Sequence, residues 1–218
     1  IPHQLSNGIC SLNEGVERLT ISCIMEIDLN GKIVDYEIFE SFIKSRIQMT
    51  YKKVNKVLEE DIIPEGYEPY AEKLKLMLEL SKILRKAKDE RGYIDFEVDE
   101  AKILVDQDCH PIDIVLRERG LGEKLIEDFM IAANETVATH IYNMNLPFVY
   151  RVHDVPDADK IEKLQILIRN FGYYFKSYKD EIHPKEVQKL LAKIQDTPEE
   201  ALISRLALRS MKQAQYSV

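Results

Sequence analysis

Two adjacent carboxylates, Glu127 and Asp128, are the first residues in this sequence that suggest chemistry. They lie in GEKLIEDFMIAANE, which has the spacing of one long helix with apolar side chains around most of its circumference. A carboxylate on such an enclosed helix must be paired, hydrogen-bonded or in contact with a wet cavity, because an isolated buried charge is costly. Two interpretations stay open: a carboxylate at the helix edge or paired with a nearby arginine, and a water-filled site lined by Glu127.

Motifs of the common enzyme classes do not occur in the 218 residues. We find no glycine-rich phosphate loop, GxSxG, HExxH or His/Cys cluster. The five histidines are scattered, and His153 in RVHD favours a turn-stabilising role over a ligand role. Three cysteines without CxxC spacing indicate neither a disulfide framework nor a zinc site. Acidic runs such as Asp106 to Asp108 fall at expected turns and helix ends, so the sequence predicts no metal site.

Aromatic residues beside a basic one suggest a second kind of chemistry. The stretch RGYIDFEV combines Arg91 with Tyr93 and Phe96. Aromatic rings stack on bases of single-stranded nucleic acid while arginine or lysine neutralises phosphates. The alternative is that Tyr93 and Phe96 alternate into the core of a sheet, and the sequence does not separate the two.

Composition limits the class of protein. The chain is 45% apolar and carries 38 acidic against 30 basic residues, a net charge of −8. It is therefore globular, and its overall charge argues against a general polyanion-binding surface, so a nucleic-acid path would have to be local. No apolar stretch reaches the length of about 18 residues that a membrane span needs, and no signal peptide opens the chain, so we expect a soluble intracellular protein.

These residues must be positioned by a mixture of hairpins and helices. Alternation from Leu19, the dipeptide Asn30-Gly31 and a resumed run over 32–43 predict a hairpin. Residues 101–106 and 112–119 predict a second. Further strands are expected at 93–98 and 146–154, and helices at 50–60, 69–90, 122–144, 157–171, 184–195 and 198–214. The predicted class is α+β: a mixed or antiparallel sheet from the N-terminal and central hairpins, packed with long helices, and a mostly helical C-terminal half.

Several segments, in order along the chain, carry a specific resemblance: IPHQLSNGICSLNEGVERLTISCIMEID, VDYEIFESFIKSRIQMTYKKVN, RGYIDF, VLRERGLGEKLIEDFMIAANETVATH, PFVYRVHD and LRSMKQAQYS. Together they resemble the catalytic domain of the ribonuclease R branch of the ribonuclease II (RNB) family. The resemblance covers essentially the whole chain. It implies a cytoplasmic 3′-to-5′ exoribonuclease that hydrolyses single-stranded RNA processively to nucleoside 5′-monophosphates with Mg²⁺.

The same resemblance implies that the chemistry lies outside residues 1–218. The family's metal-binding aspartates belong to a DxxxxxDxDD-type motif before IPHQLSNG, and its SPIRRY motif follows MKQAQYS; neither occurs here. We therefore expect the middle of a single RNB catalytic domain, without catalytic residues, without bound Mg²⁺ and inactive alone. The parent protein would be a monomer with flanking cold-shock and S1 domains.

Site residues carried over from the family are few. The aromatic residue that clamps the last nucleotides corresponds to Phe96, and a glutamate that contacts the terminal ribose corresponds to Glu127. Asn134, one heptad further, and Tyr93 are weaker RNA-binding candidates. On this reading Asp128 is structural, and Glu127 points into a cavity and does not pair with Arg117 or Arg119. The alternative function is a non-catalytic RNA-binding or protein-interaction module on the same scaffold.

Overall fold

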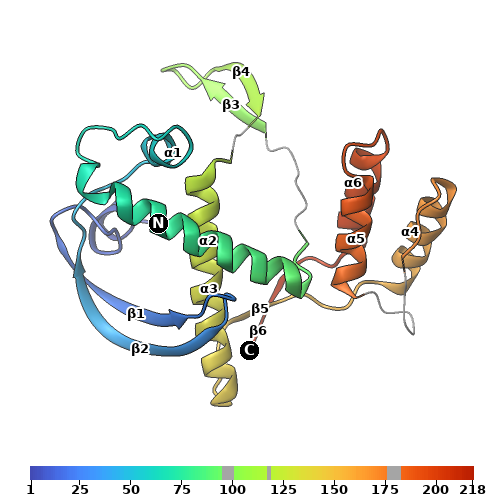
Figure 1. The fold of residues 1–218 in the computed structure, drawn as a ribbon, viewed down its shortest axis with the longest axis horizontal. Helices are drawn as coiled ribbons and strands as arrows, with labels where there is room; N and C mark the ends of the chain where they lie inside the picture. The colour runs from blue at the N-terminus through green and yellow to red at the C-terminus, as the bar shows by residue number, and fades with distance from the viewer. Residues whose placement is uncertain (95–100, 117–118, 176–182) are drawn as a thin grey trace. The chain divides into compact units, whose positions relative to one another are not determined.

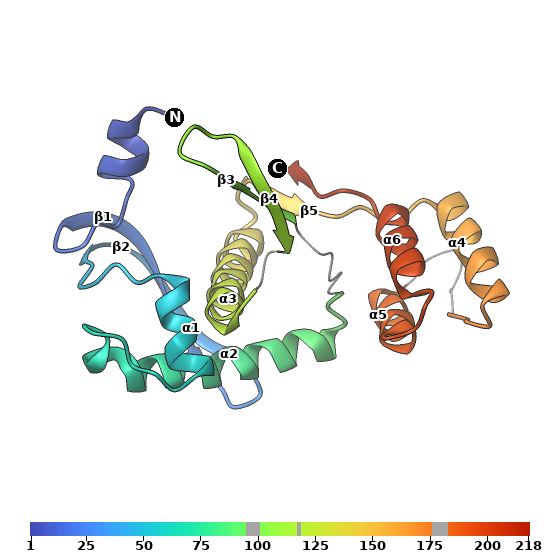
Figure 2. The same cartoon turned by 90° about the horizontal axis from the view of Figure 1, so that it is seen from above.

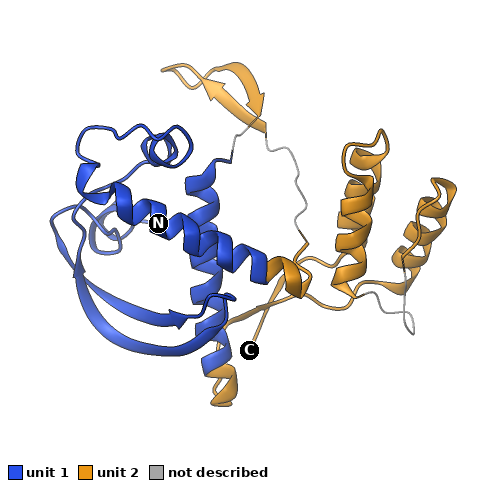
Figure 3. Ribbon diagram, in the orientation of Figure 1, with its two compact units in different colours: residues 1–87, 118–140 blue, residues 88–117, 141–218 orange. Residues whose placement is uncertain are grey.

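The computed structural model describes residues 1–94, 101–116, 119–175 and 183–218. Its contacts divide the chain into two compact units: unit 1 consists of residues 1–87 and 118–140, and unit 2 of residues 88–117 and 141–218 (Figure 3). Each unit combines helices with a small antiparallel sheet or sheets, so the predicted α+β class is confirmed. No helix in the described ranges is both long enough and apolar enough to cross a membrane.

Unit 1 contains one hairpin and three main helices. Its core joins Val54 and Val57 to Tyr67, Ala71 and Leu74, and so packs the first helix against the start of the second. The predicted helices at 50–60, 69–90 and 122–144 are confirmed. The elements are η1 (Gln4–Ile9), β1 (Glu17–Ile27), β2 (Ile33–Lys44), α1 (Tyr51–Glu59), η2 (Glu68–Tyr70), α2 (Ala71–Arg91) and α3 (Leu121–Asn143), of which α2 and α3 continue into unit 2 (Figure 1).

The β1–β2 turn is built around Gly31 and one carboxylate. Gly31 adopts a φ of +77°, and a Cβ there would lie 2.7 Å from the Cβ of Ala87, so the turn needs glycine. The predicted hairpin is confirmed. Asp28 completes the turn, because its Oδ1 accepts hydrogen bonds of 2.9 Å from the backbone N–H groups of Asn30 and Lys32. These bonds, that from Lys32 above all, lower the pKa of the Asp28 carboxyl.

The start of α3 is satisfied by side chains of α1. The backbone N–H of Gly122 donates to Asn55 Oδ1 at 2.7 Å, and that of Leu121 donates to Glu59 Oε1 at 2.7 Å. Two of the orphan donors at the helix N-terminus are thereby paired, one of them with a carboxylate that also complements the helix dipole. A Cβ on Gly122 would lie 2.8 Å from Asn55 Oδ1 and 3.1 Å from Val54 Cγ1. The absence of a side chain at this position lets α1 approach α3.

Gly122→Ala should therefore destabilise the chain. Overpacking typically costs about 1 to 3 kcal/mol, which exceeds the gain of up to about 1 kcal/mol from replacing glycine by alanine in a helix. Urea denaturation followed by circular dichroism measures the difference. Gly8→Ala is the matched control, since the nearest atom to its added Cβ, the carbonyl oxygen of His3, is 4.0 Å away. An alanine at position 122 that left the free energy of unfolding unchanged would contradict this account of the α1–α3 contact.

Unit 2 contains two short sheets and three helices. The helices α4, α5 and α6 share an apolar core, and α6 lies beside both of the others (Figures 1 and 2). The core residues are Leu164, Ile168, Leu190, Ile194, Ile203 and Ala207. The elements are β3 (Ala101–Val105), β4 (Pro111–Leu116), β5 (Tyr150–Val152), α4 (Ala158–Asn170), α5 (Pro184–Ile194), α6 (Glu200–Ser210) and β6 (Gln215–Ser217).

Strand pairing near the end of the chain differs from the prediction. The helix expected over 198–214 ends at Ser210, and β6 pairs antiparallel with β5, which is itself shorter than the predicted 146–154. Gln215 pairs with Val152 of the distant β5, although the Lys-Gln-Ala-Gln sequence that it ends has a high helix propensity. In the described ranges the hairpins form separate two-stranded sheets rather than a common one. The strand expected at 93–98 lies largely outside the described residues, and residues 93–94 are not in a strand.

Candidate RNA-contacting site and a pocket in unit 2

Asp128 is the buried member of the carboxylate pair. It is 3% exposed and accepts hydrogen bonds from Ser81 Oγ at 2.8 Å and from Arg85 Nε and Nη2 at 3.1 and 3.0 Å. Both donors come from α2, so this carboxylate joins α2 to α3. The structural role expected for Asp128 agrees with this geometry, because a buried carboxylate must have partners of this kind.

Glu127 does not have the surroundings that we expected. Its carboxylate forms an ion pair with the guanidinium of Arg119, and the two side chains are 26% and 42% exposed. The expectation that Glu127 avoids this arginine is wrong. Arg119 lies just before α3, and its long side chain reaches the second turn of the helix. A nearby apolar hollow of about 650 Å³ is lined by Gly122, Leu125 and Ile126 of α3, without Glu127.

These surroundings predict that replacing each carboxylate by the corresponding amide lowers the free energy of unfolding by a different amount. Asp128→Asn should cost about 1.5 to 3 kcal/mol, the usual worth of a hydrogen bond to a charged group. Glu127→Gln should cost no more than about 1 kcal/mol, because partly exposed ion pairs contribute little. Chemical denaturation of both variants measures the two changes in unfolding free energy. Equal costs, or a larger one for Glu127→Gln, would show that the buried carboxylate is not the one that joins α2 to α3.

The remaining candidates come from different parts of the chain. Asn134 is exposed on α3, two turns beyond Glu127. Tyr93 is half-buried in unit 2, and the ammonium of Lys88 lies 3.9 Å from the centroid of its ring, a cation–π contact. Phe96 lies outside the described residues. Glu127 and Asn134 thus belong to unit 1 and Tyr93 to unit 2.

The acidic run at the β3–β4 turn forms a cluster of possible metal ligands. Ligand atoms of Asp106, Asp108 and His110 lie within 4.8 Å of one another, and all three residues are exposed. Asp106 Oδ1, however, accepts the backbone N–H groups of residues 108 and 110 at 2.9 Å, as Asp28 does in the other hairpin. Turn geometry accounts for the cluster. An exposed turn of this kind does not fit two-metal phosphodiester hydrolysis, which needs carboxylates converging in an enclosed site.

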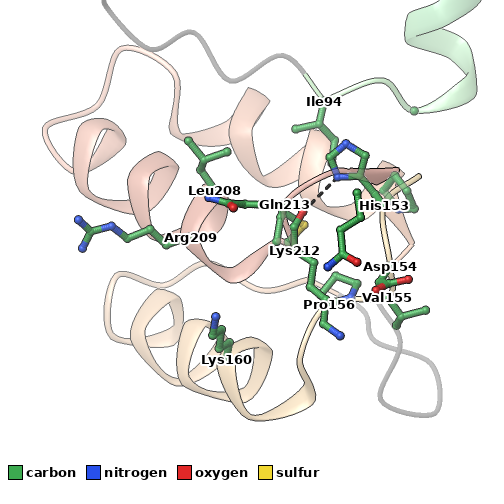
Figure 4. Close-up of a pocket in the computed structure, with 14 residues that line it drawn as sticks. Ile94, His153, Asp154, Val155, Pro156, Lys160, Leu208, Arg209, Lys212 and Gln213 are labelled. Atoms are coloured by element: carbon green, nitrogen blue, oxygen red, sulfur yellow. Dashed lines mark hydrogen bonds between the residues drawn. The ribbon is translucent and has the colours of Figure 1, made fainter. Parts of the chain in front are cut away.

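A pocket of about 1200 Å³ in unit 2 was not indicated by any single segment of the sequence (Figure 4). The β5–β6 pairing brings residues 153–156 beside residues 211–215, while α4 and α6 contribute one cation each. His153 Nδ1 lies 3.1 Å from the carbonyl oxygen of Lys212, so it links two segments that are distant in the sequence instead of stabilising the local turn that we expected. The polar residues that line the pocket include His153, Asp154, Lys160, Arg209, Lys212 and Gln213.

Comparison with known protein families identifies the family of this chain. The model of the RNB domain matches residues 1–218. The chain belongs to the RNB family. Among curated relatives, ribonuclease R of Thermotoga maritima is 47% identical over 218 residues, which are the whole of this chain and 31% of that protein. Ribonuclease R 1 of Lactococcus lactis is 44% identical over all of this chain and 27% of its own length. The chain thus spans about a third or less of these relatives.

Solved structures agree with the family assignment. This chain superposes with a TM-score of 0.93 and 30% identity on Mycoplasma genitalium RNase R, which was solved in complex with ribose-methylated single-stranded RNA. The match covers all of this chain and 34% of that one. The same protein has also been solved in complex with double-stranded RNA. The arrangement of helices and hairpins described above is therefore that of a segment of ribonuclease R.

Proposed function

We propose that this chain is the middle of a single RNB catalytic domain in a 3′-to-5′ exoribonuclease of the ribonuclease R type. The parent protein would hydrolyse single-stranded RNA processively to nucleoside 5′-monophosphates. The observation that carries the proposal is 47% identity to a ribonuclease R along the whole chain. The structural match to an RNase R in complex with single-stranded RNA supports RNA as the substrate class.

The metal, partners and location belong to the parent protein. We infer that Mg²⁺ supplies charge stabilisation and an activated water there, and that it is held by residues other than those of this chain. The exposed turn cluster at Asp106 does not fit that role, and the DxxxxxDxDD-type motif is absent from the sequence. Flanking cold-shock and S1 domains, a monomeric state and a cytoplasmic location complete the proposal.

Within this chain, the proposed RNA contacts are Phe96 and Glu127, with Tyr93 and Asn134 as weaker ones. Glu127 would accept hydrogen bonds from the hydroxyls of the terminal ribose. Its pairing with Arg119 is compatible with this role, because a carboxylate has two oxygens and about four acceptor sites. The guanidinium would hold the carboxylate in place while it receives the ribose. The side-chain exposure of 26% leaves room for such a contact.

Glu127→Gln in the parent enzyme should weaken discrimination between RNA and DNA. A missing charge-assisted bond of about 1.5 to 3 kcal/mol corresponds to a roughly 10- to 150-fold lower kcat/KM on RNA. An oligonucleotide with a 2′-deoxy 3′ end should be affected less, because the 2′-hydroxyl is the group that distinguishes the two sugars. Steady-state degradation of the two substrates measures the ratio.

Asp128→Asn is the matched control for this experiment. It removes the neighbouring carboxylate, which is occupied by Ser81 and Arg85, so it should lower stability while preserving the preference for RNA. If both variants changed stability and left the RNA preference intact, Glu127 would be part of the scaffold, and its assignment to the ribose would be wrong.

The 218-residue chain alone should not degrade RNA. Two-metal hydrolysis needs converging carboxylates, and the acidic cluster found in the described ranges lies on an exposed hairpin turn. The measurement is release of mononucleotides from a 3′-tailed single-stranded RNA in the presence of Mg²⁺, with the parent enzyme as the positive control. Progressive release by the chain, abolished by a chelator, would contradict the prediction.

The alternative, a non-catalytic RNA-binding or protein-interaction module on the same scaffold, is not favoured. The relatives that match the whole chain at 44% and 47% identity are both ribonucleases R. A parent protein that bound RNA but released no nucleotides in the presence of Mg²⁺ would reverse this preference.

A further inference from the structure

Two neighbouring hollows in unit 2 share cationic walls. The pocket of Figure 4 adjoins a second hollow of about 550 Å³ on α4 and α6, and Lys160 and Arg209 line both. Lys212 adds a cation to the first, and Lys163 adds one to the second. Asp154 is the acidic residue among those that line them. We call the two hollows together the basic pocket.

The cations of the basic pocket form no ion pair within the described residues. In residues 1–94, 101–116, 119–175 and 183–218, no carboxylate forms an ion pair with Lys160, Lys163, Arg209 or Lys212. Elsewhere on the surface, cations do find partners, as Lys75 does with Asp61 and Lys189 with Glu186. The chain carries a net charge of −8, so an excess of unpaired cations at one place departs from its general surface. Such a concentration of one sign raises the local concentration of anions.

The walls of the pocket come from segments held by the fold. Gln215 lines the pocket and pairs with Val152 in the β5–β6 ladder, and His153 continues from that ladder to contact the carbonyl of Lys212. Lys160 lies in the first turn of α4, and Arg209 in the last turn of α6, two helices that share one apolar core. The fold therefore holds the backbone positions of these cations in place, although their side chains are exposed.

We propose that the basic pocket binds phosphate groups of a single-stranded RNA, as a contact separate from Glu127. The choice of RNA rests on the proposed function. Phosphate is the chemistry that unpaired lysine and arginine recognise. A volume of about 1200 Å³ for the larger hollow exceeds the roughly 300 to 1,000 Å³ of ordinary small-ligand sites. This size favours a stretch of strand over a free mononucleotide or inorganic phosphate.

Binding of a 5′-labelled oligoadenylate RNA to the 218-residue chain, followed by fluorescence anisotropy at several NaCl concentrations, tests the proposal. The double variant Lys160→Ala, Arg209→Ala should raise Kd about tenfold. Its salt dependence, the slope of log K against log[NaCl], should fall in magnitude by roughly 0.7 for each phosphate that the variant no longer neutralises. Both side chains are exposed, so folding should be unaffected, as thermal denaturation verifies.

The matched control removes the same charge elsewhere in unit 2. Lys102 and Lys193 are exposed and line neither hollow, so the variant Lys102→Ala, Lys193→Ala should bind as the unmodified chain does. Equal decreases in affinity in the two double variants, or no RNA binding by the unmodified chain, would overturn the proposal. The assay requires no hydrolysis, so it can fail while the proposed nuclease function holds.

Competition separates a strand from a free phosphate. Adenosine 5′-monophosphate and inorganic phosphate, each at millimolar concentration and constant ionic strength, should displace little of the bound RNA. Efficient displacement by either, abolished in the Lys160→Ala, Arg209→Ala variant, would show that the pocket is a site for a free phosphate compound. That result would overturn the assignment to an RNA strand.

Discussion

The architecture of unit 1 depends on the hydrogen bonds that the buried Asp128 carboxylate accepts. It lies between α2 and α3 and receives three hydrogen bonds, one from Ser81 and two from Arg85. An unpaired charge at this depth would be strongly unfavourable, so the pairing fixes how α3 is rotated about its axis as well as where it crosses α2. With Asp128 held inward, the residue before it, Glu127, is turned toward the edge of the helix, where Arg119 reaches it. The rotation of α3 thus gives Asp128 its buried partners and brings Glu127 to Arg119.

Much of the local structure could be predicted because its causes are local. The hairpin at Asn30-Gly31 follows from a positive φ that glycine accepts, and the helices follow from apolar periodicity. The sequence also indicated that a carboxylate on α3 would need a partner. The expectation that Glu127 does not pair with Arg119 was wrong. The partners of Asp128 could not be named from the sequence, because Ser81 and Arg85 are more than forty residues away from it. The short strand β6 was missed for the same reason, since its partner β5 lies far from it in the sequence.

The basic pocket shows why net charge alone is a poor guide to partners. A value of −8 argues against polyanion binding, but it is a sum over 218 residues and says nothing of where the charges lie. Lys160, Arg209 and Lys212 come from three segments that the fold of unit 2 brings to one place. A local cluster of charges can be equally misleading. Asp106, Asp108 and His110 are grouped like metal ligands, but Asp106 makes the same backbone hydrogen bonds as Asp28 makes in the other hairpin turn. Its position is therefore explained by the turn.

Unit 1 is discontinuous in sequence, since residues 88–117 separate its two parts. A ribosome therefore delivers α2 well before α3. Arg85 and Asp128 are 43 residues apart, and at about 5 to 20 residues per second the carboxylate is added roughly 2 to 9 s after the guanidinium. During that interval the hairpin and α1 can form from local contacts. Gly31 can already approach α2, but Met25 does not yet have its partner on α3. During synthesis, unit 1 therefore cannot be completed until the inserted segment has been translated.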